Sequence, residues 1–245
     1  MIDTHAHLDP ADAGEVLARA RAAGVERVVC IATTIDGCQE ALALADRYDG
    51  VYACLGVHPH EAGGPDADRL DELRALLDHP KAVAVGETGL DWFRDYAPAD
   101  AQRRLFERQL RLAVEVGKPV VIHTRAADDD TLAALRDHAG PVILHCFSSP
   151  GLLETALERG WYVSFAGNVT FKNAHDLRAA SRAVPDDRLL AETDSPYLAP
   201  QPVRGTRNEP ANVRHTVAAL AQARGADPDD LARRIDANAD AVFGL

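Results

Sequence analysis

The feature that most constrains the fold is a regular alternation of short apolar runs and longer amphipathic stretches. Eight runs rich in Val, Ile, Leu and Cys begin near Met1, Val25, Val51, Ala82, Pro119, Pro141, Trp161 and Leu189. Runs that are apolar throughout are typical of strands covered on both faces, as in parallel sheets. Stretches with the helical spacing of apolar residues lie between them: Ala11 to Ala23, Gly37 to Tyr48, Asp66 to Asp78, Ala101 to Val116, Thr131 to His138 and Gly151 to Arg159. This order predicts a repeated βα unit.

Eight βα units in a chain of 245 residues can form a closed barrel or an open doubly wound sheet. The open sheet normally has a Gly-rich phosphate loop after its first strand. Here the first apolar run ends in His5-Ala6-His7 instead. No linker, low-complexity tract or second apolar core interrupts the pattern. We therefore predict an α/β fold, a single-domain TIM-like (β/α)8 barrel that spans residues 1–245.

Several of the apolar runs end in side chains that can bind metal ions. The candidates are His5, His7, Glu87, His123, His145 and Asp194. Side chains alternate across a strand, so His5 and His7 share one face and form a clamp. The carboxyl ends of parallel barrel strands meet at one mouth. A single His or carboxylate at a strand end is more often a hydrogen-bonded structural group, but six such residues in regular order predict a two-metal hydrolase site.

The four cysteines do not suggest a disulfide framework, because none stands in a Cys-x-x-Cys pair. Cys146 follows His145, but neighbouring residues of a strand face opposite sides, so we do not expect a thiol nucleophile. The chain shows no basic leader with a long apolar stretch and no run of about 18 apolar residues. We expect a cytoplasmic protein without membrane contact.

The charge balance is acidic, with 26 Lys and Arg against 38 Asp and Glu, a net charge of −12. Affinity for duplex DNA that does not depend on sequence comes from neutralisation of phosphates. The balance therefore argues against a broad basic face that follows a duplex. It leaves room for a local cationic pocket, and bound divalent cations would add positive charge that the formal count omits.

Six polar motifs follow one another along the chain: Asp3 to Asp9, Gly56-Val57-His58-Pro59-His60, Gly86 to Asp91, His123-Thr124-Arg125, His145 to Ser148 and Glu192 to Pro200. Motifs of this kind in this order resemble those of the TatD family of metal-dependent hydrolases, in the amidohydrolase-like superfamily. The resemblance covers residues 1–245. It implies a TIM-like barrel, a binuclear metal site and hydrolysis of phosphodiester bonds in nucleic acids.

The resemblance also implies roles for the six donors. His5, His7, Glu87 and Asp194 would hold one metal, and Glu87, His123 and His145 the other, with Glu87 as the bridge. Asp194 would also accept a proton from the attacking water, so Asp194 and Glu87 are the predicted catalytic residues. Two cations about 3.5 to 4 Å apart can activate water and stabilise the leaving oxygen. We expect two divalent ions, and whether they are Mg, Mn or Zn stays open, since imidazoles suit Mn and Zn better than Mg.

Three residues are predicted to bind substrate: Arg125, His58 and Arg204. Arg125 follows His123 by two positions and so shares its face, where its guanidinium would grip phosphate or form a surface salt bridge. His58 would donate to phosphate or support a ligand. His60 is expected to be exposed to solvent.

For several other side chains the sequence leaves two roles open. Trp92 and Phe93 would stack on a base or form a hydrophobic lid. Glu192 lies one layer below Asp194, where it would orient a ligand His through its second nitrogen or form an internal salt bridge. Asp3 has the same relation to His5. Relatives commonly carry a basic residue where this chain has Thr206, which leaves the substrate preference open.

Three functions follow. The first is a metal-dependent nuclease, a deoxyribonuclease of exonucleolytic type, whose substrates are DNA or RNA ends and single strands. The alternative is a barrel hydrolase of a small amide, lactone or acyl ester. The third is a non-catalytic metal-binding or partner-binding protein. The presence of all six candidate metal ligands argues against it. We expect no obligate protein partner.

Overall fold

Eight parallel strands form one sheet in sequential order in the computed structural model, which describes residues 1–245. Each strand pairs with the next one along the chain. The strands are β1 (Ile2–Ala6), β2 (Arg27–Ile31), β3 (Val51–Leu55), β4 (Ala82–Asp91), β5 (Val120–Arg125), β6 (Val142–Leu144), β7 (Tyr162–Phe165) and β8 (Leu189–Ala191). Every strand begins within two residues of the predicted position.

The sheet closes between β1 and the segment that follows β8. Ala6 pairs with Ser195 in an isolated parallel bridge. The backbone N–H of His7 donates to the carbonyl of Ser195 at 2.8 Å, and that of Asp194 donates to the carbonyl of His5 at 3.0 Å. This closure confirms the TIM-like (β/α)8 barrel.

A buried side chain strengthens the same seam. The carboxylate of Asp3 accepts from the backbone N–H of Thr193 at 2.9 Å and from its hydroxyl at 2.5 Å. It also accepts from the backbone N–H of His5 at 3.3 Å. Asp3 is fully buried, and burial raises its pKa to about 8 against the opposing effect of the Thr193 hydrogen bonds. Neither of the two roles expected for Asp3, contact with the second nitrogen of His5 or an internal salt bridge, is observed, because its oxygens accept the hydrogen bonds of the seam.

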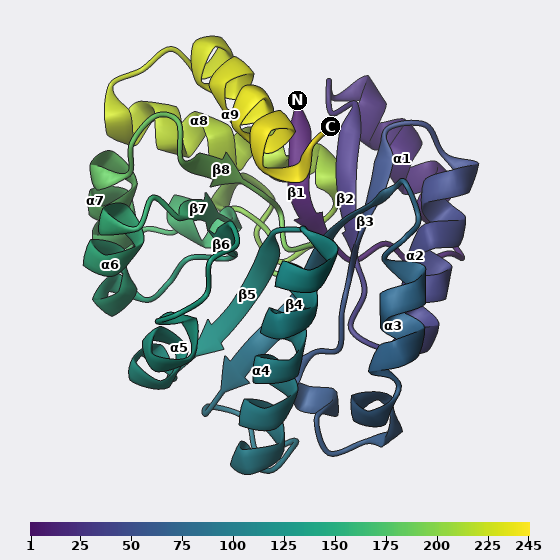
Figure 1. Cartoon of the computed structure of the whole chain (residues 1–245). Coiled ribbons are helices and arrows are strands. Elements are labelled where there is room, and N and C mark those ends of the chain that lie inside the picture. Colours follow the sequence, from purple (N-terminus) through teal and green to yellow (C-terminus); the bar gives the residue numbers. More distant parts are fainter.

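The helices form a ring around the strands, and the two termini lie close together (Figure 1). Their bounds are α1 (Ala13–Ala22), α2 (Ile35–Arg47), α3 (Leu70–Leu76), α4 (Ala99–Val116), α5 (Asp128–Leu135), α6 (Leu153–Glu158), α7 (His175–Ala183), α8 (Val213–Arg224) and α9 (Pro228–Phe243). None of them combines the length and the hydrophobicity that a membrane-spanning helix requires.

Two of the predicted helices begin three or more residues from the expected position. Helix α5 starts three residues early, at Asp128, because three consecutive Asp residues in its first turn complement the positive end of the helix dipole. Helix α3 is shorter than predicted, since Pro65–Asp68 forms a separate 3-10 turn ahead of it.

Two buried glutamines of α4 fasten the helix to the strands that carry the candidate site. The side chain of Gln109 accepts from the backbone N–H of Val57 at 2.9 Å and donates to the Val57 carbonyl at 2.8 Å and to the Thr88 hydroxyl at 2.7 Å. The side chain of Gln102 accepts from the backbone N–H of Asp91 at 2.9 Å. These bonds fix the ends of β3 and β4 relative to each other.

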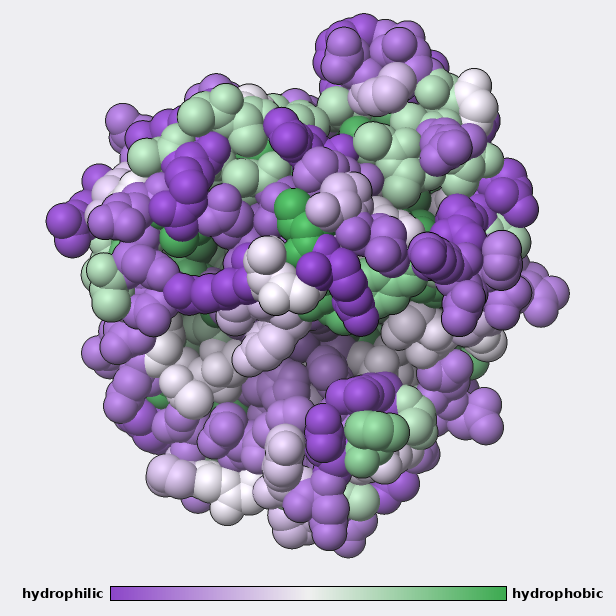
Figure 2. All heavy atoms as spheres, turned by 180° about the vertical axis from the view of Figure 1, so that it is seen from behind, coloured by the Kyte–Doolittle hydropathy of each residue, from purple (hydrophilic) through white to green (hydrophobic).

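The core consists of one cluster of 66 buried apolar residues between the strands and the helices. Every residue of β4 is buried, as expected for a parallel strand that is covered on both faces. A single contiguous core is the mark of a single folding unit. On this basis we propose that residues 1–245 form one domain. Seen from behind, the surface of the molecule is hollowed near its lower centre, with hydrophilic residues in and around the hollow (Figure 2).

Candidate metal centre

Glu87 lies at the centre of the site, buried within β4. Its Oε1 is 2.8 Å from His123 Nδ1 and 2.9 Å from His145 Nε2. Its Oε2 faces the other way, 3.5 Å from His5 Nε2 and 3.8 Å from His7 Nε2. Oε2 thus faces His5 and His7, and Oε1 faces His123 and His145 together with His58, whose Nε2 is 3.4 Å away.

Asp194 completes the side that carries His5 and His7. Its Oδ1 is 3.7 Å from the Nε2 atoms of both imidazoles. Asp194 has a φ of 53°, in the left-handed region that Asp and Asn tolerate better than most residues. This conformation lies three residues after the end of β8, and the carboxylate faces His5 and His7.

The donor atoms fit divalent cations. The ligand atoms of His5, Glu87 and His145 lie within 4.8 Å of one another, and so do those of His5, His7 and Asp194. Both ring nitrogens of His5 are buried without a hydrogen-bond partner. Burial and the neighbouring His145 lower the pKa of His5, which keeps its imidazole neutral. A buried neutral imidazole with a free lone pair is the form that binds metal.

The carboxylate at the centre is ionised. Burial alone would raise the pKa of Glu87, but the imidazoles of His145 and His58 and the hydrogen bonds from His123 and His145 hold it well below its usual range. Burial likewise opposes the ionised form of Asp194, and its contacts with His7 and His5 still lower its pKa. The site therefore offers two negative charges to a cation.

Glu192 contacts the second ring nitrogen of His145, a candidate metal ligand, which is one of the two roles predicted for it. Its Oε1 is 3.2 Å from His145 Nδ1 and accepts from the backbone N–H of Cys146 at 2.8 Å. Its Oε2 accepts from the Ser164 hydroxyl at 2.5 Å. These bonds fix the ring of His145 so that its Nε2 faces Glu87.

Cys146 gives no support to a thiol nucleophile. Strand β6 ends at Leu144, so His145 and Cys146 lie beyond it and the alternation of strand side chains does not apply to them. Burial and nearby carboxylates, however, raise the pKa of Cys146 well above its usual value. The thiol therefore stays protonated.

A third group of donors lies beside the first two. The ligand atoms of His58, His60 and His123 lie within 4.8 Å of one another. His58 Nδ1 accepts from the backbone N–H of His60 at 3.1 Å, and its Nε2 is 3.4 Å from Glu87 Oε1. The prediction that His60 is exposed is wrong, because its Nε2 lies 2.8 Å from Asp91 Oδ2 and the ring is half-buried.

Asp91 is a site residue that the sequence analysis did not single out. Its Oδ2 contacts both His60 and, at 3.2 Å, His123 Nε2. The parity of β4 could have revealed it, because side chains four positions apart on a strand share a face and Glu87 was already a candidate.

The two predicted substrate-binding arginines lie on aromatic rings, away from the carboxylates. The guanidinium of Arg125 is 3.9 Å from the ring centroid of Phe93, and that of Arg204 is 3.9 Å from the centroid of Phe171. Both arginines are exposed. No salt bridge occupies either of them, so the salt-bridge interpretation of Arg125 is wrong.

Trp92 and Phe93 have different surroundings. The indole N–H of Trp92 donates to Asp130 at 2.9 Å, and Arg103 covers the ring at 5.0 Å. Phe93 is 59% exposed. Trp92 is therefore held against the helices, whereas Phe93 is largely exposed, with the guanidinium of Arg125 over its ring.

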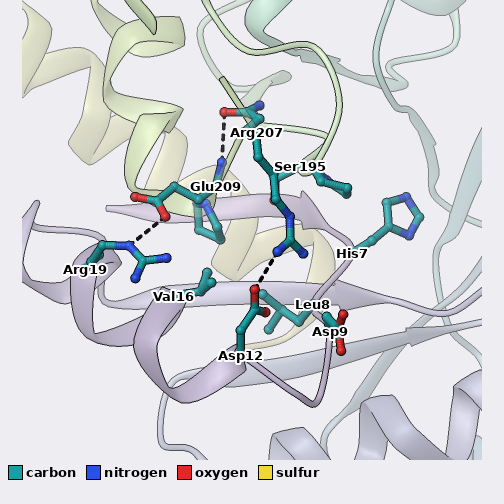
Figure 3. Close-up of a pocket in the computed structure, with 12 residues that line it drawn as sticks. His7, Leu8, Asp9, Asp12, Val16, Arg19, Ser195, Arg207 and Glu209 are labelled. Carbon is teal, nitrogen blue, oxygen red and sulfur yellow. Dashed lines mark hydrogen bonds and ion pairs between the residues drawn. The ribbon is translucent and has the colours of Figure 1, made fainter. Parts of the chain in front are cut away.

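A cavity of about 120 Å³ lies next to His7, between α1 and the segment after β8 (Figure 3). Arg207 donates to Asp12 at 2.5 Å, and Arg19 donates to Glu209 at 2.8 Å (Figure 3). Each arginine of this cavity is neutralised by a carboxylate. The cavity therefore offers no free cation to a phosphate, unlike the rim that carries Arg125.

Known proteins resemble this chain over its whole length. A family model described as TatD related DNase matches residues 2–244. An uncharacterized metal-dependent hydrolase of Mycobacterium tuberculosis, TatD, is 40% identical over 260 residues, which cover 100% of this chain and 98% of the relative. A 3'-5' ssDNA/RNA exonuclease TatD of Citrobacter rodentium is 39% identical over 243 residues, covering 96% and 92%. The crystal structure of YJJV, a TatD homologue from Escherichia coli K12, has a TM-score of 0.93 at 31% identity, covering 100% and 98%.

Proposed function

Because this chain belongs to the TatD-related DNase family of metal-dependent hydrolases, we propose that it is a nuclease that cleaves phosphodiester bonds at the ends of single-stranded DNA or RNA. The relative from Citrobacter rodentium carries the name of an exonuclease with such substrates. The observation that carries the proposal is the position of Glu87, whose Oε2 faces His5 and His7 and whose Oε1 faces His123 and His145.

Two divalent cations fit this arrangement. His5, His7 and Asp194 would hold one ion, and His123 and His145, which both contact Glu87 Oε1, would hold the other, with Glu87 contributing to both. When bound, such ions lower the pKa of a water molecule and neutralise charge on a phosphoryl group. Glu192 would keep His145 in the orientation that this role needs.

The other residues of the site divide the remaining tasks. The Oδ1 of Asp194 faces His5 and His7, so we assign Oδ2 as the atom that accepts a proton from the attacking water. Arg125 would bind a phosphate of the substrate through its guanidinium, and Arg204 would bind a second one. His58 accepts from the backbone N–H of His60 through Nδ1, so its proton lies on Nε2, which faces Glu87 Oε1 at 3.4 Å; His58 would therefore support Glu87, the second of its two expected roles.

The test is cleavage of end-labelled nucleic acids. We expect protein loaded with manganese, magnesium or zinc to shorten single-stranded DNA and RNA and to leave blunt duplex largely intact. A chelator should abolish the reaction, and re-addition of metal should restore it. A loaded protein that leaves every one of these substrates intact would contradict the proposal.

One observation favours the alternative of a small ester, amide or lactone substrate. The net charge of −12 disfavours long polyanions. The same loaded protein is therefore to be assayed with small esters and lactones. Turnover of these compounds in the absence of nuclease activity would select the alternative.

A further inference from the structure

Few large apolar side chains are exposed on this protein, and most of them surround the candidate site. The four are Phe93, Tyr96, Val114 and Tyr197, with exposures between 52% and 63%. The three aromatic ones stand on the loops that directly follow β4 and β8, at the end of the barrel where the donor residues lie. An exposed aromatic face is costly in water, and its repetition around one opening indicates a binding surface.

The two tyrosines stand at opposite ends of the row of imidazoles. Tyr197 meets the ring of His7 edge-on, with the centroids 6.1 Å apart. Tyr96 meets His60 in the same manner at 4.7 Å. Between these ends the rings of His5, His145 and His123 follow one another at centroid distances of 3.9 and 6.0 Å. A phosphate bound over the centre of this row would have an aromatic side chain on either side.

Positive charge accompanies the aromatic rim on one side. Arg125 lies 3.9 Å above the ring of Phe93, and Arg94 lies 5.2 Å from the same ring and 6.0 Å from Tyr96. Neither arginine is paired with a carboxylate, in a chain whose net charge is −12. Aromatic faces beside free guanidinium groups match the chemistry of a nucleotide, which joins a flat base to a phosphate.

We infer that Tyr197 on one side, and Tyr96 with Phe93 on the other, are stacking platforms for the two unpaired bases that flank the bond to be cleaved. The inference rests on the proposed nuclease function and names the residues that select single strands. In a duplex an internal base is covered on both faces and a terminal base on one, so the two platforms cannot both stack on bases of one strand without unstacking them. Stacking accepts every base, so the platforms would bind without reading sequence.

The test pairs protein variants with oligonucleotides that lack single bases. The probe is a fluorescently labelled single-stranded decamer, and its binding is measured by anisotropy with chelator present, so that nothing is cut. One decamer is intact, and others lack the base of the last or the next-to-last nucleotide at either end. We expect Tyr197→Leu and Tyr96→Leu each to weaken binding of the intact decamer by roughly 5- to 150-fold. Each variant should lose little further affinity when the base that its ring contacts is already missing.

Conservative and distant substitutions serve as controls. Tyr197→Phe and Tyr96→Phe keep the ring and should bind as the unmodified protein does. Tyr162 stands at the opposite end of the barrel with Arg188 5.1 Å from its ring centroid, so Tyr162→Leu removes a similar pair without effect on binding. If a leucine variant fails to give a cooperative melting curve, the missing-base decamers on the unmodified protein still measure the platforms.

The outcomes separate this inference from the function on which it rests. If the unmodified protein cleaves single strands but the leucine variants and the missing-base decamers bind normally, the platforms are excluded and the nuclease stands. If the unmodified protein neither binds nor cleaves any nucleic acid, the proposed function itself fails.

Discussion

At the scale of the single residue, the backbone conformation of Asp194 allows a substitution that removes its acid–base chemistry and keeps its structural role. Its φ of 53° is a conformation that Asn adopts as readily as Asp. Asp194→Asn therefore keeps the turn, the volume and one oxygen that can contact a cation, but the amide cannot accept a proton at neutral pH.

We expect Asp194→Asn to retain its fold and most of its metal while turnover falls by about 10²- to 10⁴-fold, as is usual for the loss of a general base. Glu87→Gln should lose metal as well, because a neutral amide is a poor bridge between two cations. Elemental analysis and single-turnover kinetics on both variants would decide. An Asp194→Asn protein with full metal and normal turnover would remove Asp194 from the mechanism.

A second prediction concerns Arg125, whose guanidinium lies over the ring of Phe93. Arg125→Ala should weaken binding of single strands and reduce the slope of log affinity against log salt by about 0.7, the value for one lost phosphate contact. Its metal content should not change. Arg111 on α4 is similarly exposed, and Arg111→Ala should leave both binding and slope unaltered. A loss of metal from Arg125→Ala would instead assign Arg125 a structural role.

At the scale of the element, helix α4 positions the strands of the site through polar side chains of a type that is usually exposed at a protein surface. Gln109 is fully buried, and it satisfies both the N–H and the carbonyl of Val57. Gln109→Met would fill the same space and leave these buried groups without partners.

We expect Gln109→Met to lower the free energy of unfolding by about 1 to 3 kcal/mol. The exposed Gln222 of α8 is the matched position, where Gln222→Met should change stability by about 0.5 kcal/mol or less. Urea unfolding of both variants measures the difference. Equal stability of the two would show that α4 holds the strands by apolar packing alone.

The strands were predictable from the sequence because buried parallel strands are apolar throughout, and their first residues lie within two positions of the expected ones. Helix α7 was not predicted. Among its residues Leu177 is the only large apolar one, and the rest of its apolar face consists of alanine, so the segment lacks the large apolar residues that mark the other helices. Boundaries that depend on charge, such as the start of α5 at Asp128, were also missed.

The candidate donors were predictable for a different reason. Their polar side chains stand at the ends of apolar runs, and the barrel topology brings those ends together. Contacts between loops were not predictable in this way. Arg207 and Asp12 are separated by 195 positions, and their pairing depends on the paths of two segments without periodic structure. The different surroundings of Trp92 and Phe93 depend on Asp130 and Arg103, which belong to other elements.

At the scale of the whole molecule, metal binding and folding should be linked, because the donors come from strands distributed around the barrel. Free metal at a hundred times its dissociation constant would stabilise the folded state by about 2.7 kcal/mol per site. For a chain of this size we therefore expect each bound ion to raise the melting temperature by about 5 to 11 °C above its value with chelator.

The same link predicts the behaviour of a double variant. His5→Ala together with His7→Ala should retain one bound ion of two and lose part of this thermal shift. Calorimetry and elemental analysis measure the two effects. If reconstitution with manganese or zinc gives neither bound metal nor a thermal shift, the binuclear site is excluded.

The seam between β1 and the segment after β8 has a consequence for synthesis on the ribosome. The first candidate donor, His5, leaves the ribosome early, but its carbonyl must wait for the N–H of Asp194, which is made 189 positions later. At about 5 to 20 residues per second this delay amounts to roughly 10 to 40 s. During that time the nascent chain exposes a His-x-His pair and an unpaired strand edge. Capture of the full metal complement and closure of the barrel should therefore occur together, at the end of translation.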